Sequence, residues 1–246
     1  MKRLLSILTI LVCITAEGKQ PKVTSLPFGE LSTGESTTLY TITNRRGASM
    51  QLLDYGARIV SIMMPDRKGH YGDVVVGFGD IENFEKKDRF IGPVIGRFGN
   101  RINHAAFTLD GIRYELVANE ELGGEPVQCH GGTMGFDRFI WDATPVKEEG
   151  RTGVKFHRVS PDGEQGFPGT MDVNVTYWLT DDNKVRVEYE ATTDKPTVVN
   201  LSNHTYFNLK GNEGGYVMDH LLQVEADTCI QNNAQFCPDI LRHVDG

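Results

Sequence analysis

A strict period-two alternation of apolar and polar residues runs through residues 170–192, and no other feature constrains the fold of this chain as much. The apolar positions of its first half are Met171, Val173, Val175, Tyr177 and Leu179. The opposite face carries Asp172, Asn174, Thr176 and Trp178. After a polar turn the alternation resumes with Val185, Val187 and Tyr189. Because successive side chains of a strand point to opposite faces, the pattern predicts an antiparallel hairpin with one buried and one exposed face.

Shorter alternating or apolar runs predict further strands along the rest of the chain. They cover residues 37–43, 50–64 with a break at Gly56, 73–77, 107–116 and 220–226. Asp110 and Gly111 form the turn of the 107–116 hairpin, since Asp-Gly is favoured where both central residues need positive φ. The one helix that the sequence predicts begins after Asp80, whose side chain caps residues 81–84.

These elements predict an all-β protein. Because helical periodicity is nearly absent, the simplest arrangement is a large antiparallel β-sandwich in which one long, curved sheet packs on another. No internal repeat or low-complexity linker divides the chain, so we expect one sandwich domain over residues 17–246.

The first residues of the chain predict an export signal. A basic start and an apolar run at residues 4–15 precede Ala16, which suits the position before a cleavage site. The run is too short to span a bilayer comfortably. We therefore expect residues 1–16 to be a signal peptide and the protein to be exported, to the periplasm or out of the cell. Cys13 leaves a lipoprotein as the alternative, which Val12 disfavours because a small residue is expected there.

The net charge limits the possible binding partners, and the cysteine spacing limits the possible metal sites and disulfides. The formal net charge is −8 and no block of Lys and Arg occurs, which argues against nucleic acid as a partner. Beyond the signal, Cys129, Cys229 and Cys237 match no zinc-binding spacing. A Cys229–Cys237 bridge is one alternative in an oxidising compartment, and we favour three cysteines without a disulfide.

Polar and ring-bearing residues gather in three short segments. They are GRFGNRI at residues 96–102, QCHGG at residues 128–132 and NLSNHTYFNLKG at residues 200–211. Each falls at a strand end or in a loop of the predicted fold, where binding residues are commonly found.

Each residue in these segments has a chemical and a structural interpretation. Arg101 beside Asn100 offers a planar fork of donors for ligand oxygens, although a lone arginine is more often part of a surface ion pair. His130, followed by two glycines, either approaches a ligand closely or is incidental to a tight turn. His204 can act as a general acid or base, but a single histidine is more often structural.

Taken together, the three segments favour chemistry. They contain no Cys-His metal spacing, no phosphate-binding glycine loop before a helix and no Gly-x-Ser-x-Gly nucleophile turn. What remains is acid–base chemistry on a small polar ligand without a cofactor, and a structural calcium ion is left open. A carbohydrate fits, because aromatic rings stack on sugar faces while Arg, Asn and His bond to hydroxyl groups.

The same segments resemble the aldose 1-epimerase (galactose mutarotase) family. GRFGNRI is similar to the family's GR-x-x-NRI segment, CHGGTMGFDRFIWD to its HGG-x-x-GF segment, and NLSNHTYFNLKG to its NH-x-YFNL signature. The similarity extends from about residue 41 to about residue 227 and keeps the family's order of motifs. It implies a supersandwich of the galactose mutarotase type and interconversion of the α and β anomers of aldohexoses such as galactose and glucose.

The resemblance also implies roles for individual residues. His204 corresponds to the general acid that protonates the ring oxygen, and His130 to a second histidine that bonds to the sugar near that oxygen. Asn100 and Arg101 correspond to residues that bind sugar hydroxyls. The implied reaction needs no cofactor, and we expect a monomer whose partner is a small aldohexose.

The family's general base has no counterpart in this sequence. That base is a glutamate near the family's C-terminus, and a sugar-binding aspartate precedes it in a DHN-like segment. Neither segment is present, and no glutamate follows Glu225. We therefore expect a C-terminally incomplete chain with impaired activity, in which sandwich edges and apolar faces lack their cover.

Two alternatives to an active epimerase are left open. A non-catalytic sugar-binding remnant of the same fold would keep the cleft without the base. An epimerase acting on a phosphorylated sugar would need extra basic residues in the cleft, and an exported protein rarely meets such a substrate.

Overall fold

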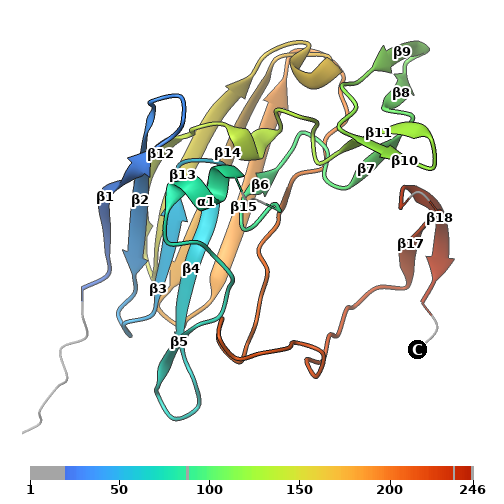
Figure 1. Ribbon diagram of the computed structural model, residues 1–246. Coiled ribbons are helices and arrows are strands. Elements are labelled where there is room, and N and C mark those ends of the chain that lie inside the picture. Colours follow the sequence, from blue (N-terminus) through green and yellow to red (C-terminus); the bar gives the residue numbers. More distant parts are fainter. Residues whose placement is uncertain (1–19, 87–88, 235, 245–246) are drawn as a thin grey trace, which may run out of the picture.

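The chain folds into two large antiparallel sheets that face each other (Figure 1). The computed structural model describes residues 20–86, 89–234 and 236–244. The expected signal peptide at residues 1–16 and the alternative at Cys13 lie outside the described residues. Apolar side chains from both sheets meet in one core, so the predicted all-β sandwich is confirmed.

The first sheet contains five strands in sequence order. They are β1 (Lys22–Glu30), β2 (Ser36–Thr43), β3 (Ser49–Leu53), β4 (Arg58–Pro65) and β5 (Tyr71–Asp73). β2 is the strand expected at residues 37–43, and β3 and β4 are the two halves of the expected stretch 50–64. The break lies where expected, because Gly56 takes a φ of 76° between β3 and β4.

The second sheet contains the strand pair that the alternation predicted. Its four strands are β12 (Asp142–Glu148), β13 (Arg151–Ser160), β14 (Met171–Thr180) and β15 (Val185–Thr193). β14 pairs with β15 without a register shift, and Tyr177 lies opposite Val187. The hairpin predicted at residues 170–192 is therefore confirmed.

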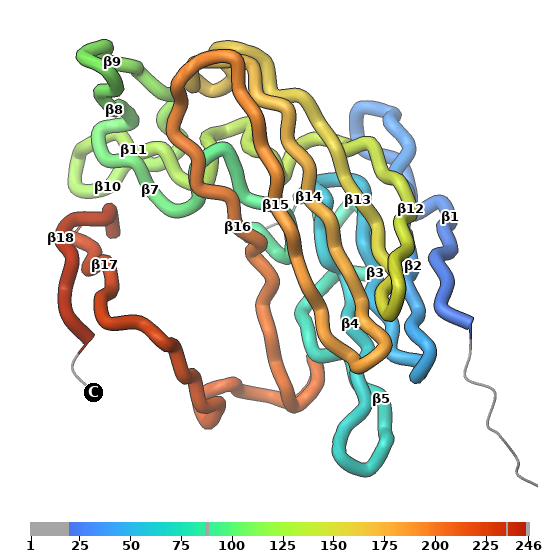
Figure 2. Tube along the Cα trace, turned by 180° about the vertical axis from the view of Figure 1, so that it is seen from behind, coloured from blue at the N-terminus to red at the C-terminus, as the bar shows by residue number. Residues whose placement is uncertain are grey.

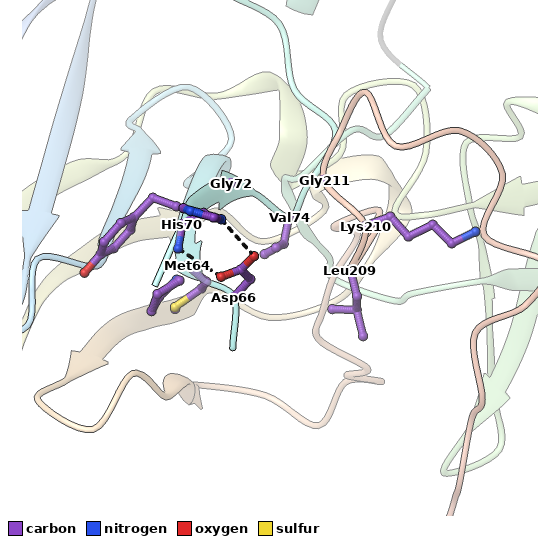
Figure 3. A pocket seen from close by; sticks show the side chains of 10 residues that line it. Met64, Asp66, His70, Gly72, Val74, Leu209, Lys210 and Gly211 are labelled. Atoms are coloured by element: carbon purple, nitrogen blue, oxygen red, sulfur yellow. Dashed lines mark hydrogen bonds and ion pairs between the residues drawn. The ribbon is translucent and has the colours of Figure 1, made fainter. Parts of the chain in front are cut away.

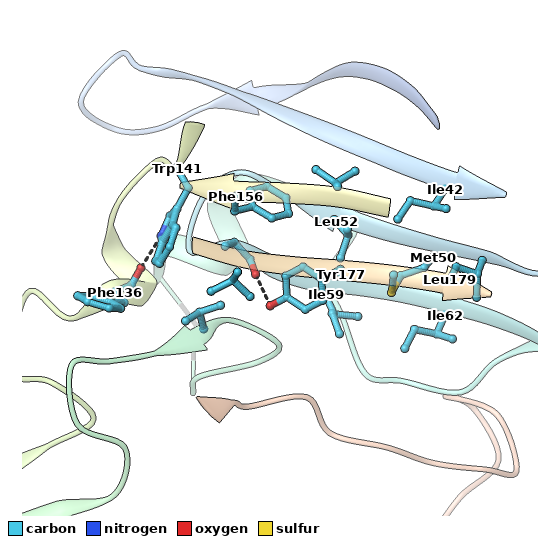
Figure 4. Close-up of a cluster of buried hydrophobic side chains, with 14 of the residues drawn as sticks. Ile42, Met50, Leu52, Ile59, Ile62, Phe136, Trp141, Phe156, Tyr177 and Leu179 are labelled. Carbon is cyan, nitrogen blue, oxygen red and sulfur yellow. Dashed lines mark hydrogen bonds between the residues drawn. The ribbon is translucent and has the colours of Figure 1, made fainter. Parts of the chain in front are cut away.

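Tyr177 and Phe156 lie at the centre of the core between the sheets (Figure 4). The Tyr177 hydroxyl donates to the carbonyl oxygen of Ala57 over 2.7 Å, which ties β14 to the turn between β3 and β4. At the end of the core, the indole N–H of Trp141 donates to the carbonyl oxygen of Phe136 over 3.1 Å. Full burial of one large apolar side chain stabilises a fold by about 1.5–3 kcal/mol.

The outer face of β14 is less exposed than the alternation predicted. Thr176 and Trp178 are 9% and 4% exposed. The guanidinium of Arg151 lies over the Trp178 ring at 4.1 Å, and the indole N–H donates to Glu188 over 2.9 Å. Long charged side chains of neighbouring strands cover the tryptophan, which period-two patterning does not anticipate.

Among the described residues one α-helix forms, α1 (Ile81–Lys86), and it begins where predicted. The Asp80 carboxylate accepts a hydrogen bond from the backbone N–H of Asn83 over 2.8 Å, as a capping residue does. Ile81 and Phe84 point into a second apolar cluster on the outer side of the first sheet, together with Leu53.

Short sheets of two or three strands complete the fold. They are β8 (Ala106–Leu109) with β9 (Ile112–Glu115); β10 (Glu120–Leu122), β11 (Glu125–Cys129) and β7 (Arg101–Asn103); β16 (Ser202–Asn203) with β6 (Val94–Ile95); and β17 (Thr228–Asn232) with β18 (Pro238–His243). Single 3-10 turns lie at Phe136–Arg138 and Glu164–Gly166. The β8–β9 pair is the hairpin predicted at 107–116. In Figure 2 the β17–β18 hairpin lies beside β7, β10 and β11.

Two strand predictions need correction. Of residues 73–77 only Asp73 lies in a strand, β5. Val75 forms an isolated antiparallel bridge with Phe207, and the backbone N–H of Val76 donates to the carbonyl oxygen of Tyr206 over 2.9 Å. Residues 220–226 are not a strand. They pair with no other strand among the described residues, and Leu221 and Leu222 are exposed. Alternation sets which side chains share a face, but a strand also needs a neighbour to bond.

Two further observations concern disulfide bonds and membrane-spanning helices. Within the described residues no disulfide forms, so the Cys229–Cys237 alternative is wrong. In the part of the chain that the structure describes, no helix has the length and apolar character required to cross a bilayer.

Candidate active site

Two of the three predicted segments lie side by side. β16, in NLSNHTYFNLKG, pairs antiparallel with β6, which leads into GRFGNRI. The backbone N–H of Asn200 donates to the carbonyl oxygen of Arg97 over 2.9 Å, and that of Gly99 donates to Asn200 over 2.8 Å. Segments about a hundred residues apart are thus held together by backbone hydrogen bonds.

The third segment joins them through a reciprocal contact. The backbone N–H of His130 donates to the carbonyl oxygen of Asn100 over 2.9 Å, and the backbone N–H of Asn100 donates to Nδ1 of His130 over 3.0 Å. Gly131 passes so close to Gly96 that a Cβ atom there would lie 1.8 Å from the Gly96 carbonyl oxygen. Only glycine fits at that position.

This arrangement places His130 and His204 against each other. Their ring centroids are 5.1 Å apart and the rings are nearly perpendicular, at 87°. The ring of Phe90 lies 4.7 Å from that of His130 and 5.9 Å from that of His204. The centroid of the Tyr206 ring also lies 5.1 Å from that of the His204 ring. Both histidines are half-buried, so each is shielded yet reachable.

The hydrogen bond from Asn100 assigns the tautomer of His130. Because Nδ1 accepts that bond, the neutral ring carries its proton on Nε2. Burial lowers the pKa of His130 to about 4, the charges of His204 and Arg101 act in the same direction, and Glu120 opposes them. At neutral pH His130 is therefore an uncharged ring with one donor, its Nε2–H.

The backbone of His204 is clamped on both sides. Its N–H donates to the carbonyl oxygen of Pro93 over 3.0 Å, and its carbonyl oxygen accepts from Gly92 over 3.1 Å. The neighbouring Asn203 amide donates to the Gly92 carbonyl and to the Tyr177 hydroxyl, each over 3.0 Å. The backbone thus has the sheet bonding that a structural histidine would have, while the imidazole faces His130 and Phe90.

Arg101 lies beside the histidine pair and is ion-paired. Its Nε lies 2.7 Å from Oε2 of Glu120, and its Nη2 lies 3.3 Å from Oε1. The Arg101 and Glu120 side chains are 24% and 32% exposed, so this is a half-buried pair. The ion-pair interpretation of Arg101 is therefore correct in part, since the fork faces Glu120 while its Nη1 lies 3.5 Å from Oδ1 of Asn100.

Neighbours of these residues in the same motifs have scaffold roles. Arg97 is 2% exposed, and its guanidinium donates to Ser160 and to the carbonyl oxygens of Pro161 and Pro168. Burial raises the pKa of Cys129 to about 12, so this thiol stays protonated at neutral pH and is not a nucleophile.

Sequence reasoning missed Phe90 and Glu120. Phe90 is part of none of the three segments, and Glu120 lies on β10, whose sequence carries no motif. One backbone signal links Phe90 to the predicted residues, although it is visible only in the structure. Phe90, Asn100 and His130 take positive φ values of 56°, 64° and 53°. Such values are uncommon outside glycine and cluster at functional sites.

A separate cavity of about 230 Å³ lies between the β4–β5 hairpin and residues 209–211 (Figure 3). Its Asp66 and His70 pair with each other over 3.5 Å, and Lys210 extends away from them. Lys210 pairs instead with Asp219 over 2.7 Å, so the charged groups of this cavity do not converge on a ligand position. Among the described residues no group of three His, Cys, Asp or Glu could hold a metal ion.

Comparison with known proteins agrees with this geometry. The aldose 1-epimerase family model matches residues 38–240, which include all three segments. The chain belongs to the aldose 1-epimerase family. It is 38% identical to human galactose mutarotase over 216 residues, which cover 88% of this chain and 60% of that protein. It is 37% identical to the Escherichia coli aldose 1-epimerase over 194 residues, which cover 79% of this chain and 54% of that protein.

Solved structures place the chain in the same fold. The galactose 1-epimerase of Lactobacillus acidophilus superposes with a TM-score of 0.79 at 26% identity, covering 92% of this chain and 64% of that one. An aldose epimerase homologue from C. elegans gives 0.73 at 32% identity, covering 83% and 61%. The resemblance of the three motifs is confirmed, and the chain spans about 60% of the length of these relatives.

Proposed function

We propose that this chain carries the sugar-binding and proton-donating part of an aldose 1-epimerase site, which interconverts the α and β anomers of aldohexoses such as galactose and glucose. The proposal rests on the half-buried imidazoles of His130 and His204, whose ring centroids lie 5.1 Å apart. The hydrogen bond from Asn100 fixes His130 as a neutral donor. The names of the related proteins support galactose as a substrate.

Mutarotation sets the requirements for the site. The ring oxygen of the sugar must gain a proton while the anomeric hydroxyl loses one, so that the ring opens. Rotation about the bond between C1 and C2 and reclosure then give the other anomer. Each positioned acid or base typically accelerates such a step by about 10²–10⁴-fold.

His204 is the residue that we assign as proton donor. His130 cannot take up a proton on Nδ1 without losing its bond from Asn100, and its pKa of about 4 keeps it neutral at pH 7. Its Nε2–H is suited to bonding the sugar near the ring oxygen. Asn100 and Arg101 lie next to it and bind sugar hydroxyls.

The proposal covers the donor side of the reaction. Glu120 is a carboxylate at the site, but both of its oxygens bond to Arg101, so we do not assign it as the base. This pairing favours one alternative, a site that binds sugar without turning it over. Measuring sugar binding and mutarotation in parallel distinguishes such a site from an active epimerase.

The proposal also includes where the protein is located and its oligomeric state. The basic start and apolar run at residues 4–15 support export, and the net charge of −8 supports a neutral sugar as ligand over nucleic acid. The proposed reaction needs no cofactor, and we propose that the protein works as a monomer, which its elution in size-exclusion chromatography tests.

The experiment follows the optical rotation of freshly dissolved α-D-galactose with purified protein, beside calorimetric titration with D-galactose. We expect acceleration over buffer, and we expect His204→Gln to remove it while sugar binding persists. Binding without acceleration would favour the non-catalytic sugar-binding alternative. Activity that survives in His204→Gln would show that the proton donor is misassigned, and absence of both binding and acceleration would refute the proposal.

A further inference from the structure

Phe90 lies where it touches both imidazoles of the site. Its ring meets that of His130 at 67° with 4.7 Å between centroids, and that of His204 at 33° with 5.9 Å. The contact with His130 is edge-to-face, an arrangement that is favourable and orients the two rings relative to each other. Phe90 is thus in contact with the proposed donor and with its neutral partner at the same time.

The backbone around Phe90 is pinned in place. The Tyr206 hydroxyl donates to the carbonyl oxygen of Arg89 over 3.1 Å, and the Arg58 guanidinium donates to that of Ile91 over 3.1 Å. Phe90 itself has a φ of 56°, which is sterically unfavourable for a side chain of this size. A position held in this conformation by bonds on both sides indicates that the placement of the ring matters.

We propose that Phe90 is a positioning residue for the reaction: its ring fixes the orientation of the His130 imidazole and shields that imidazole from water. This inference rests on the proposed function for its catalytic consequence, but the placement of the ring is independent of it. The hydrogen bond from the Tyr206 hydroxyl to the carbonyl oxygen of Arg89 connects the backbone next to Phe90 to the segment that carries His204. The positions of both imidazoles therefore depend on one connected group of residues.

The charged and titratable groups that face His130 make the shielding measurable. They are His204, Arg101 and Glu120. Burial is the largest cause of the lowered pKa of His130, ahead of these charges. Removing the Phe90 ring admits water while leaving all three groups in place. The pKa of His130 should then rise from about 4 toward its ordinary value of 6.5.

The experiment is a pH titration of the 15N-histidine NMR spectrum of the full chain for wild type, Phe90→Ala and Phe90→Leu. In wild type we expect His130 to show the Nε2–H tautomer and to stay neutral above pH 5. In Phe90→Ala its pKa rises toward 6.5 and the two tautomers mix. Phe90→Leu keeps an apolar side chain, so it gives a smaller rise and serves if the alanine variant fails to fold.

A matched control uses Phe28 on β1, which is half-buried like Phe90 and packs against Phe84 in the second apolar cluster. Phe28→Ala should leave the pKa and tautomer of His130 unchanged even if it lowers stability. In mutarotation assays Phe90→Ala should reduce kcat about tenfold or more, as expected for a misplaced catalytic group, and change KM far less.

Each outcome decides the proposal. An unchanged pKa and tautomer of His130 in both Phe90 variants would overturn it, as would a raised KM with unchanged kcat, which would make Phe90 a direct sugar contact. If wild type shows no mutarotase activity but Phe90→Ala still moves the pKa of His130, the proposed function fails while the positioning role stands.

Discussion

The core between the two sheets and the loops that hold the histidine pair are built by different means. In the core, regular strands present alternating apolar side chains, and many similar contacts share the stabilisation. In the loops, a few backbone hydrogen bonds, one close approach of two glycines and three residues at positive φ fix the geometry. The stability of the core therefore comes from many contacts of one kind, whereas the geometry of the loops depends on a few contacts that have no substitute.

Tyr177 joins the two regions. Its ring is buried in the core, and its hydroxyl donates to Ala57 and accepts from Asn203, the residue before His204. The loops are thus anchored to the buried core. Damage to the core should therefore lower the stability of the whole protein, while damage to the loops should remove the site first.

The largest expected effect is on the core. Phe156→Ala removes a fully buried ring and should lower the free energy of unfolding by about 3–5 kcal/mol. Urea unfolding followed by tryptophan fluorescence measures it. On the same strand, Val159 is 50% exposed, so Val159→Ala should change stability by less than about 0.5 kcal/mol. A loss below about 1 kcal/mol for Phe156→Ala would mean that the core does not dominate stability.

The next effect concerns the close approach of the loops. Gly131→Ala places a Cβ atom 1.8 Å from the Gly96 carbonyl oxygen, so the backbone must move. We expect a loss of about 3 kcal/mol or more and loss of galactose binding. Gly111→Ala also has positive φ but meets no atom within 4 Å, and should cost about 1–2 kcal/mol with binding intact. Equal losses in the two variants would contradict the importance of the contact between Gly131 and Gly96.

A smaller effect is expected at the connection between the regions. Tyr177→Phe leaves the Ala57 carbonyl and the Asn203 amide without one partner each and should cost about 1–3 kcal/mol. It should also weaken turnover, because Asn203 holds the backbone next to His204. Tyr189→Phe on β15, which packs against the same core, is the control and should leave turnover unchanged. Stability lost without any change in turnover would show that the core does not support the site.

The smallest effect is a pH dependence from His130. The pKa of this residue is about 4 in the folded protein against an ordinary value of 6.5. Between these values the unfolded chain binds a proton that the folded chain does not, so the stability is full above pH 6.5 and is lost as the pH falls toward 4. Urea unfolding between pH 7.5 and 5 should show a shallower decline in His130→Gln than in wild type. Parallel declines in both proteins would refute the lowered pKa.

The sequence predicted much of the fold because period-two alternation states which residues share a face. The sequence alone predicts the β14–β15 hairpin, the break at Gly56 and the cap at Asp80. The prediction failed at residues 220–226, where the alternation is present but no strand lies alongside among the described residues. It also failed at Trp178, which is covered by Arg151 from the neighbouring strand.

The candidate site was predictable only as far as its motifs. Three segments pointed to Asn100, Arg101, His130 and His204, and the structure brings these four residues together. Phe90 carried no signal, because its position depends on bonds to residues far along the chain. The tautomer of His130 was equally hidden, since it follows from a single backbone hydrogen bond.

A titration of the 15N-histidine NMR spectrum with D-galactose tests the proposed sugar site most directly. We expect saturable shifts for His130 and His204, with His130 remaining in its Nε2–H form. His104 and His157, which pair with surface carboxylates, should not move and serve as controls in the same spectrum. Absence of any shift at His130 and His204 at saturating sugar, or equal shifts at all four histidines, would contradict the claim that these loops form a sugar site.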